Sequence, residues 1–140
     1  MIDYELLTDD QGSRLVLFSR FAGIAGLVDG LHSLGLRLLA LGYGTPFLNI
    51  PMSYTYPTMD YMINHLETVG STLQRDGLPK AFGPMVITFT GDGNVSKGAQ
   101  DIFRSLPHEY VKASQLKALT LNSGRVCSYP PPPPFFSFYV

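Results

Sequence analysis

A short apolar run leads directly into a glycine-rich segment near the middle of the chain. The run Met85–Thr90 contains several β-branched residues, which is typical of a strand buried on both faces of a parallel sheet. The segment GDGNVSKGA follows it at 91–99, and we expect a helix next, over about 95–105. A strand, a glycine turn and a helix in this order are typical of the dinucleotide-binding fold, with Ser96 where the third glycine often stands. The sequence therefore predicts an α/β fold.

The glycine turn offers the groups that a pyrophosphate requires. Gly91 permits a tight turn, and Gly93 has no Cβ that would keep a pyrophosphate away from the backbone. A helix that begins near Val95 directs free N–H groups and the positive end of its dipole at the same point. Asn94 and Ser96 can add side-chain donors. We therefore expect this turn to bind cofactor phosphates, although glycine turns also end strands for purely structural reasons.

A second short strand is expected at Glu109–Val111, about 20 residues after the glycine turn, the spacing seen in this fold. An NAD-binding protein places an acidic residue at the end of this strand, where it binds the ribose 2′-OH. Lys112 occupies that place here, and a cation suits a 2′-phosphate better. The prediction is NADP, with NAD left open because Glu109 is near. In the intervening helix, Gly98 or Ala99 would permit close packing on the first strand.

Two longer helices are predicted from the spacing of apolar residues. Between Phe21 and Leu41 apolar residues recur every three or four positions, the period of a helix. Small residues at 22–26 would allow another element or a ligand to approach the backbone closely. Thr58 is a suitable N-cap for a second helix over about 59–75, which Asp76 and Gly77 would end.

The other segments are shorter or irregular. Arg14–Ser19 is apolar and follows a turn sequence, so it is expected to be a buried strand. Residues 43–57 are aromatic and interrupted by proline, which predicts a structured loop, and a weak helix is expected at 114–119. Five consecutive prolines at 130–134 cannot donate hydrogen bonds to a sheet. We therefore expect the tail 122–140 to be disordered and outside the fold, or else to be a ligand for a proline-binding module.

Composition excludes several classes of function. Ten basic and eleven acidic residues give a net charge of −1, which argues against binding to nucleic acid or to anionic membranes. The apolar stretches all contain Arg, Asp or His, so no membrane span is expected. Cys127 and three scattered histidines give neither a disulfide nor zinc spacing, so no metal is predicted. No targeting sequence follows Met1, and the chain is expected to be a soluble, intracellular protein.

Several segments together resemble one enzyme family. They are IDYE at 2–5, GSR at 12–14, AGIAG at 22–26, LHSLGLRLLALG at 31–42, TPF at 45–47, GDGNVSKGAQ at 91–100 and LPHEYV at 106–111. Over residues 2–119 the chain is similar to the lysine–2-oxoglutarate reductase region of the alpha-aminoadipic semialdehyde synthase family. It resembles fungal saccharopine dehydrogenases and alanine dehydrogenases more distantly.

The resemblance implies an NADP-dependent oxidoreductase that condenses lysine with 2-oxoglutarate and reduces the imine to saccharopine. It implies the end of an alanine dehydrogenase-like N-terminal substrate domain with a long linking helix at 1–57. Residues 58–121 would start a dinucleotide-binding domain with a partial Rossmann-type parallel sheet. The resemblance assigns Asp9, Arg14 and Phe18 to the substrate cleft. A guanidinium at Arg14 also suits carboxylate-rich substrates on its own chemistry, whereas the simpler alternative is a surface ion pair with a neighbouring aspartate.

No catalytic residue is predicted in this chain. The family's proton-transferring lysine and histidine lie upstream of the position that matches Met1, so we expect part of a longer enzyme that is inactive alone. Among the histidines, His32 is expected to be a packed or capped core residue and His65 to lie on a helix surface. His108 precedes the second strand, close to where the cofactor rim would lie, but no role is expected for it.

The family resemblance also implies a mitochondrial location, with a cytoplasmic one as the alternative, and a homo-oligomer of the full-length enzyme. Two other functions stay open at this point. One is a non-catalytic dinucleotide-binding or regulatory module, and the other is an alanine dehydrogenase-like enzyme.

Overall fold

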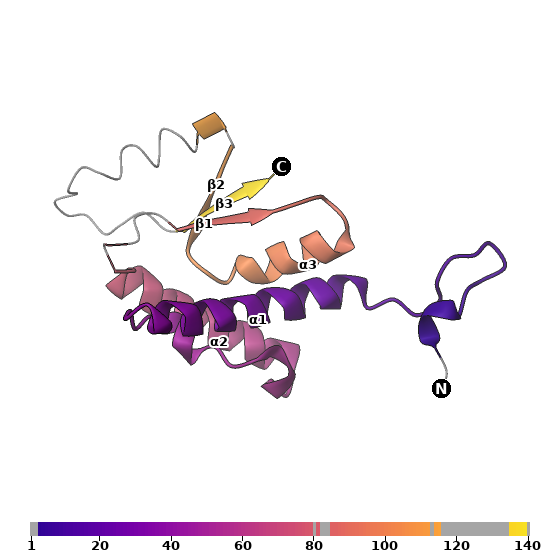
Figure 1. The fold of residues 1–140 in the computed structure, drawn as a ribbon, viewed down its shortest axis with the longest axis horizontal. Coiled ribbons are helices and arrows are strands. Elements are labelled where there is room, and N and C mark those ends of the chain that lie inside the picture. Colours follow the sequence, from indigo (N-terminus) through magenta and orange to yellow (C-terminus); the bar gives the residue numbers. More distant parts are fainter. Residues whose placement is uncertain (1–2, 80, 82–84, 113, 116–134, 140) are drawn as a thin grey trace.

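The computed structural model describes residues 3–79, 81, 85–112, 114–115 and 135–139, and most of their regular structure is helical (Figure 1). The helices are α1 (Ser19–Ala40), α2 (Met59–Asp76) and α3 (Asn94–Phe103), with short 3₁₀ helices η1 (Tyr4–Leu6), η2 (Pro46–Asn49) and η3 (Ser53–Thr55). The strands are β1 (Val86–Phe89), β2 (His108–Val111) and β3 (Phe135–Tyr139). The three longer predicted helices, the first two β-strands around the glycine turn, and the structured loop at 43–57 are therefore confirmed.

Helix α1 is the element around which the others pack. It contacts α3, η2 and η3, while η2 also contacts α2. The core between these elements contains Val28 of α1, Leu66 of α2, Phe103 of α3, and Phe47 and Ile50 of the loop, all fully buried. The apolar period of α1 thus places one face in the core, as expected for a helix whose four glycines must be compensated by packing.

The N-terminal end of α2 shows why it begins where it does. Thr58 has extended backbone geometry, and its hydroxyl oxygen accepts a hydrogen bond from the backbone N–H of Tyr61 at 3.2 Å. Asp60 adds a negative charge in the first turn, where the helix dipole favours it. At the other end Gly77 has a φ of +71°, a conformation that glycine adopts at little cost. The predicted N-cap and helix end are both confirmed.

We expect Thr58→Ala to lower the free energy of unfolding by about 1 kcal/mol, because it removes the acceptor for an otherwise unpaired N–H group. Urea unfolding followed by circular dichroism measures this loss. Thr68→Ala is the matched control, since Thr68 lies within the same helix, is exposed and bonds only to the carbonyl of Asn64. A control variant as unstable as Thr58→Ala would contradict the capping role.

The strands pair differently from the expected Rossmann-type arrangement. In that fold the first two strands are neighbours, but here β1 and β2 each pair in parallel with β3, in the order β1-β3-β2. Val86 and His108 lie opposite Phe136 and Phe135 respectively. The partial Rossmann-type sheet is therefore not shown. Residues 135–139, which we expected outside the fold, form β3, and residues 122–134 with Cys127 lie outside the described residues.

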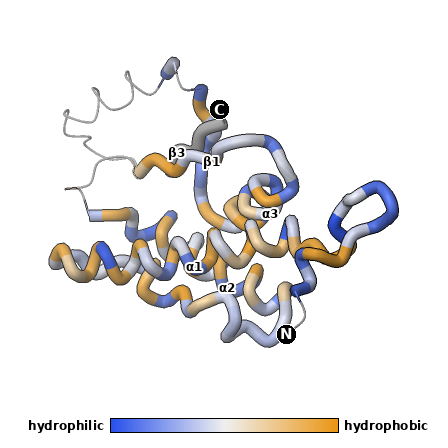
Figure 2. The backbone as a smooth tube through the Cα atoms, turned by 45° about the vertical axis from the view of Figure 1, so that its right-hand side comes forward, coloured by the Kyte–Doolittle hydropathy of each residue, from blue (hydrophilic) through white to orange (hydrophobic). Residues whose placement is uncertain are grey.

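The expected strand at Arg14–Ser19 is not formed. Leu15 and Leu17 are 65% and 61% exposed, and the only pairing recorded in this stretch is an isolated antiparallel bridge between Thr8 and Arg14. Figure 2 shows the result as a hydrophobic stretch, coloured orange, between a hydrophilic loop and α1. An apolar run forms a buried strand only if another strand and a covering layer are present, and none of the described residues supplies them here. Most of the expected helix at 114–119 lies outside the described residues.

Candidate functional site

The glycine turn connects β1 to α3 as predicted. Gly91 has a φ of +76°, in the left-handed region that favours glycine. Gly93 is the N-cap residue of α3, and no side chain caps the helix there. The first backbone bond of the helix runs from the N–H of Lys97 to the carbonyl of Gly93 at 3.0 Å. The N–H groups of the preceding helical residues therefore remain available for a ligand, because the first turn of a helix has no internal partners.

Space is open beside this helix end. A Cβ atom placed on Gly93 would meet nothing within 4 Å, and the same holds for Gly91. The backbone of the turn can therefore be approached closely from outside. Asp92 is exposed in the same turn but does not line the adjacent pocket. This geometry fits an anionic group at the start of α3.

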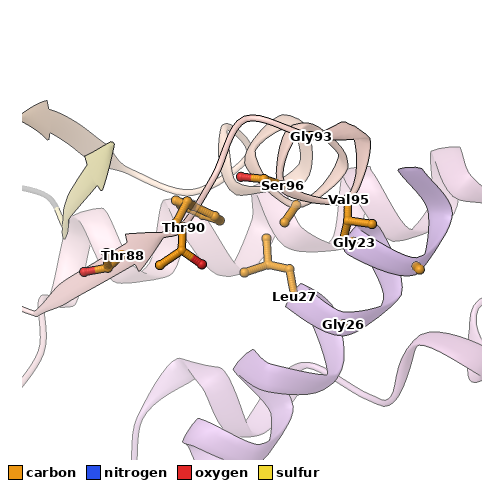
Figure 3. A pocket seen from close by; sticks show the side chains of 11 residues that line it. Gly23, Gly26, Leu27, Thr88, Thr90, Gly93, Val95 and Ser96 are labelled. Atoms are coloured by element: carbon orange, nitrogen blue, oxygen red, sulfur yellow. The ribbon is translucent and has the colours of Figure 1, made fainter. Parts of the chain in front are cut away.

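An open pocket of about 410 Å³ lies next to the turn, between β1, the start of α3 and helix α1 (Figure 3). Its polar side chains include the hydroxyls of Thr88, Thr90 and Ser96, while Leu27 of α1 supplies part of its apolar wall. The Ser96 hydroxyl oxygen accepts a hydrogen bond from the Gln100 side-chain amide at 3.0 Å, which orients it. No charged side chain lines the pocket. The pocket thus combines apolar walls with a few hydroxyl groups, as small-molecule sites usually do.

Sequence reasoning missed the contributions of Thr88, Thr90 and Leu27 to this pocket. Thr88 lies in β1 and Thr90 directly follows it. The signal that could have found them is therefore a pair of hydroxyl groups at the carboxyl end of a strand that precedes a glycine turn. Leu27 could not have been found from its neighbours in the sequence, because it reaches the pocket only through the packing of α1 on α3.

The small residues of α1 and α3 hold these two helices together. A Cβ on Gly23 would collide with the backbone carbonyl of Val95, and a Cβ on Gly98 would collide with the carbonyl oxygen of Arg20. The two glycines therefore let the helix backbones touch. Of the two residues expected to permit close packing of α3 on its strand, Gly98 and Ala99, Gly98 instead faces α1. The contact fixes the start of α3, and so the amides of the turn, against α1.

Lys112 is not one of the residues that line the pocket beside the turn. It is exposed immediately after β2, and its backbone N–H donates to the Gln115 side-chain oxygen at 2.9 Å. Since β3 lies between β1 and β2, the end of β2 is two strand spacings from β1, or about 10 Å. The structure thus brings together Gly91, Gly93, the helix start and Ser96, but it does not add Lys112 to them.

The three residues assigned to the substrate cleft lie together on the N-terminal arm that precedes α1. The Asp9 carboxylate accepts the backbone N–H groups of Gln11 and Ser13, so it stabilises the turn of this arm. Arg14 pairs with Glu5 at 3.5 Å, rather than with a neighbouring aspartate, and Phe18 packs edge-on against Tyr4. None of the three lines the pocket. Figure 1 shows the arm leaving α1 at the end where the glycine turn also lies.

Each of the three histidine rings takes part in one hydrogen bond within the chain. His32 Nδ1 lies 2.7 Å from the carbonyl of Ile50 and joins α1 to the loop, in agreement with a packed role. His65 is half-buried and lies 2.9 Å from the Tyr56 hydroxyl, so it is not a simple surface residue. His108 lies 2.7 Å from the carbonyl of Leu106, packs on Phe103 and does not line the pocket.

Comparison with known proteins gives one consistent result. No family model matches the chain. It is 45% identical over 122 residues to alpha-aminoadipic semialdehyde synthase, mitochondrial, of Bos taurus, and 49% identical over 119 residues to alpha-aminoadipic semialdehyde synthase of Arabidopsis thaliana. The resemblance seen in the sequence is thereby confirmed. The matches cover 87% and 85% of this chain, but only 13% of the bovine alpha-aminoadipic semialdehyde synthase and 11% of the plant one.

The rat alpha-aminoadipic semialdehyde synthase, which also carries the word mitochondrial in its name, is 44% identical over 120 residues.

Two further findings apply to the described part of the chain. None of its helices has the length and apolar character to cross a bilayer. None of its histidine, cysteine, aspartate and glutamate side chains forms a group of three that could hold a metal ion.

Proposed function

We propose that this chain is part of an NADP-dependent oxidoreductase of lysine degradation, the lysine–2-oxoglutarate reductase of alpha-aminoadipic semialdehyde synthase. The observation that carries the proposal is the uncapped start of α3 after the left-handed Gly91, beside a pocket lined by hydroxyl groups. The identity to alpha-aminoadipic semialdehyde synthases over most of the chain supports the same enzyme class.

The residues of the turn fit the pyrophosphate of a dinucleotide. The N–H groups of Asn94, Val95 and Ser96 would donate to phosphate oxygens, and the open side of Gly93 leaves space for them. The hydroxyls of Thr88 and Thr90 would orient the adjoining part of the cofactor. NADPH, when bound, supplies the hydride that reduces an imine. The family resemblance and the charge of Lys112 both favour NADP over NAD.

Arg14 would bind a carboxylate of 2-oxoglutarate or saccharopine. Its present partner is Glu5, at 3.5 Å with both side chains about half exposed, and such pairs contribute little to stability. A substrate carboxylate could therefore replace Glu5 at small cost, and a bidentate geometry would make the new pair stronger. Phe18 would add an apolar contact at the start of α1. In this proposal the arm presents lysine and 2-oxoglutarate to a cofactor held at the turn.

Proton transfer in the reaction requires further groups, which the family resemblance places upstream of the residue that matches Met1. We therefore propose that this chain alone binds the nucleotide but catalyses the reaction slowly, since general acid–base groups contribute about 10²–10⁴ in rate.

We also propose a mitochondrial location and a homo-oligomer for the full-length enzyme. The names of the bovine and rat relatives support the mitochondrial location.

We expect Gly93→Asp to weaken NADPH binding by at least about tenfold, because a carboxylate at the helix start repels phosphate and occupies its place. Titration of the ¹⁵N-labelled chain with NADPH, followed by NMR, measures the affinity and should show shifts for Val95 and Ser96. Gly44→Asp is the matched control, since a side chain there also meets open space. Titration with NADH in parallel decides the cofactor. Equal binding by both variants, or no saturable shift at the turn of the unaltered chain, would overturn the proposal.

A further inference from the structure

Helix α3 buries a polar side chain on the face that also carries its core residues. Gln100 has only 4% of its surface exposed. It lies four residues after Ser96 and three before the fully buried Phe103, so the three residues share one face of the helix. An apolar residue is usual at such a position, because a buried amide lowers stability unless it is hydrogen-bonded. The amide of Gln100 therefore requires a partner nearby.

That partner lies at the pocket beside the glycine turn. The Nε2–H of Gln100 donates to the Oγ of Ser96 at 3.0 Å, and Ser96 lines the pocket (Figure 3). Gln100 itself does not line it. The two residues are about one turn apart on α3, which keeps their side chains within reach of each other. The buried amide thus acts on the pocket through the serine hydroxyl.

The bond from Gln100 determines what the serine hydroxyl can do for a ligand. A hydroxyl accepts through the lone pairs of its oxygen and donates its single proton. Because the Gln100 amide donates to the oxygen, the proton must point elsewhere. Within the part of the chain that the structure describes, no hydrogen bond uses this proton. Ser96 therefore presents an O–H donor to a ligand in the pocket.

A ligand that meets this donor should bring oxygen atoms that only accept. The ionised oxygens of a pyrophosphate have this character, and hydrogen bonds to a charged acceptor are the stronger ones. The N–H groups at the start of α3 are donors as well, so the hydroxyl adds to the same set. If the hydroxyl could turn its lone pairs toward the phosphate, it would repel the phosphate instead. The amide of Gln100 disfavours that orientation.

We propose that Gln100 is a positioning residue of the phosphate site, whose amide holds the Ser96 hydroxyl ready to donate to a phosphate oxygen. The inference rests on the proposed function and extends it to a residue that does not touch the cofactor. Gln100 thereby favours ligands that carry a phosphate at this point over ligands that must donate to the serine.

The test is a double-mutant cycle on the full ¹⁵N-labelled chain, with NADPH as the probe. Gln100→Met keeps an unbranched side chain but removes the amide, and should weaken NADPH binding about threefold or more, whereas Ser96→Ala should weaken it about tenfold. The double variant should bind as Ser96→Ala does, because the glutamine acts through the serine. A purely structural role for Gln100 would make the two losses multiply. Gln74→Met is the matched control, since Gln74 is exposed on α2 and does not line the pocket.

A second measurement needs no ligand. The side-chain N–H signals of Gln100 in the NMR spectrum of the free chain should shift in Ser96→Ala, because the acceptor is lost. Signals that do not move would show that the amide does not donate to the serine, and would overturn the inference. Unchanged affinity in Gln100→Met, or multiplied losses in the double variant, would overturn it as well while NADPH binding by the unaltered chain upholds the proposed function. No saturable NADPH binding by the unaltered chain would overturn both.

Discussion

Gly23→Ala is expected to lower the free energy of unfolding by about 3 kcal/mol or more, in contrast to the usual gain when alanine replaces a helical glycine. The methyl group would collide with the carbonyl of Val95, which belongs to the backbone of α3 and cannot move without the helix. The α1–α3 contact would have to open, and the buried side chains beside it would lose neighbours. Urea unfolding monitored by circular dichroism gives the loss directly.

Gly30→Ala is the matched control for this prediction. Gly30 lies in the middle of the same helix, and a Cβ there meets nothing within 4 Å. The control should therefore stabilise the chain by about 0.5–1 kcal/mol, since alanine restricts the unfolded chain more than glycine does. If Gly23→Ala proved as stable as Gly30→Ala, the close approach of the two helices would be refuted.

Phe103→Ala should have the largest effect of any single truncation, a loss of about 4 kcal/mol. Phe103 is fully buried at the end of α3, and its ring packs on Phe89 of β1 at 5.4 Å and on His108 of β2 at 5.2 Å. It therefore joins the helix to two strands at once. A loss of this size approaches the total stability of an ordinary domain.

Hydrogen exchange provides a second measurement for the same substitution, since the amides of β1 and β2 should lose protection before those of α2. Phe21→Ala is the control, because Phe21 is the same residue type but 63% exposed, and its truncation should change stability by less than about 0.5 kcal/mol. Similar losses in the two variants would show that Phe103 does not hold the strands to α3.

Helix α2 and the glycine turn could be predicted because their signals are local. Thr58 caps its own helix three residues on, and Gly91 adopts its left-handed conformation whatever packs nearby. The same holds for the start of α3, which depends on residues within one turn. These are also the features that carry the proposed phosphate site, so the core of that site was visible in the sequence.

The features that could not be predicted depend on distant segments. The run that contains Leu15 and Leu17 has the composition of a buried strand, but no partner among the described residues covers it. β3 lies between β1 and β2, although a proline run precedes it and suggested a tail outside the fold. The position of Lys112 relative to β1 depends on that order of strands, which spacing along the chain does not indicate.

Helix α1 carries a second backbone contact besides the one at Gly23. A Cβ on Gly35 would come within 3 Å of the backbone at Phe47 and Leu48, so the backbone of η2 also packs directly against α1. The two glycines are twelve residues apart, or about 18 Å along the axis. A helix resists bending over such a length, so α1 keeps the two contacts at a fixed separation. The glycine turn and the structured loop at 43–57 would therefore move together, as one rigid unit.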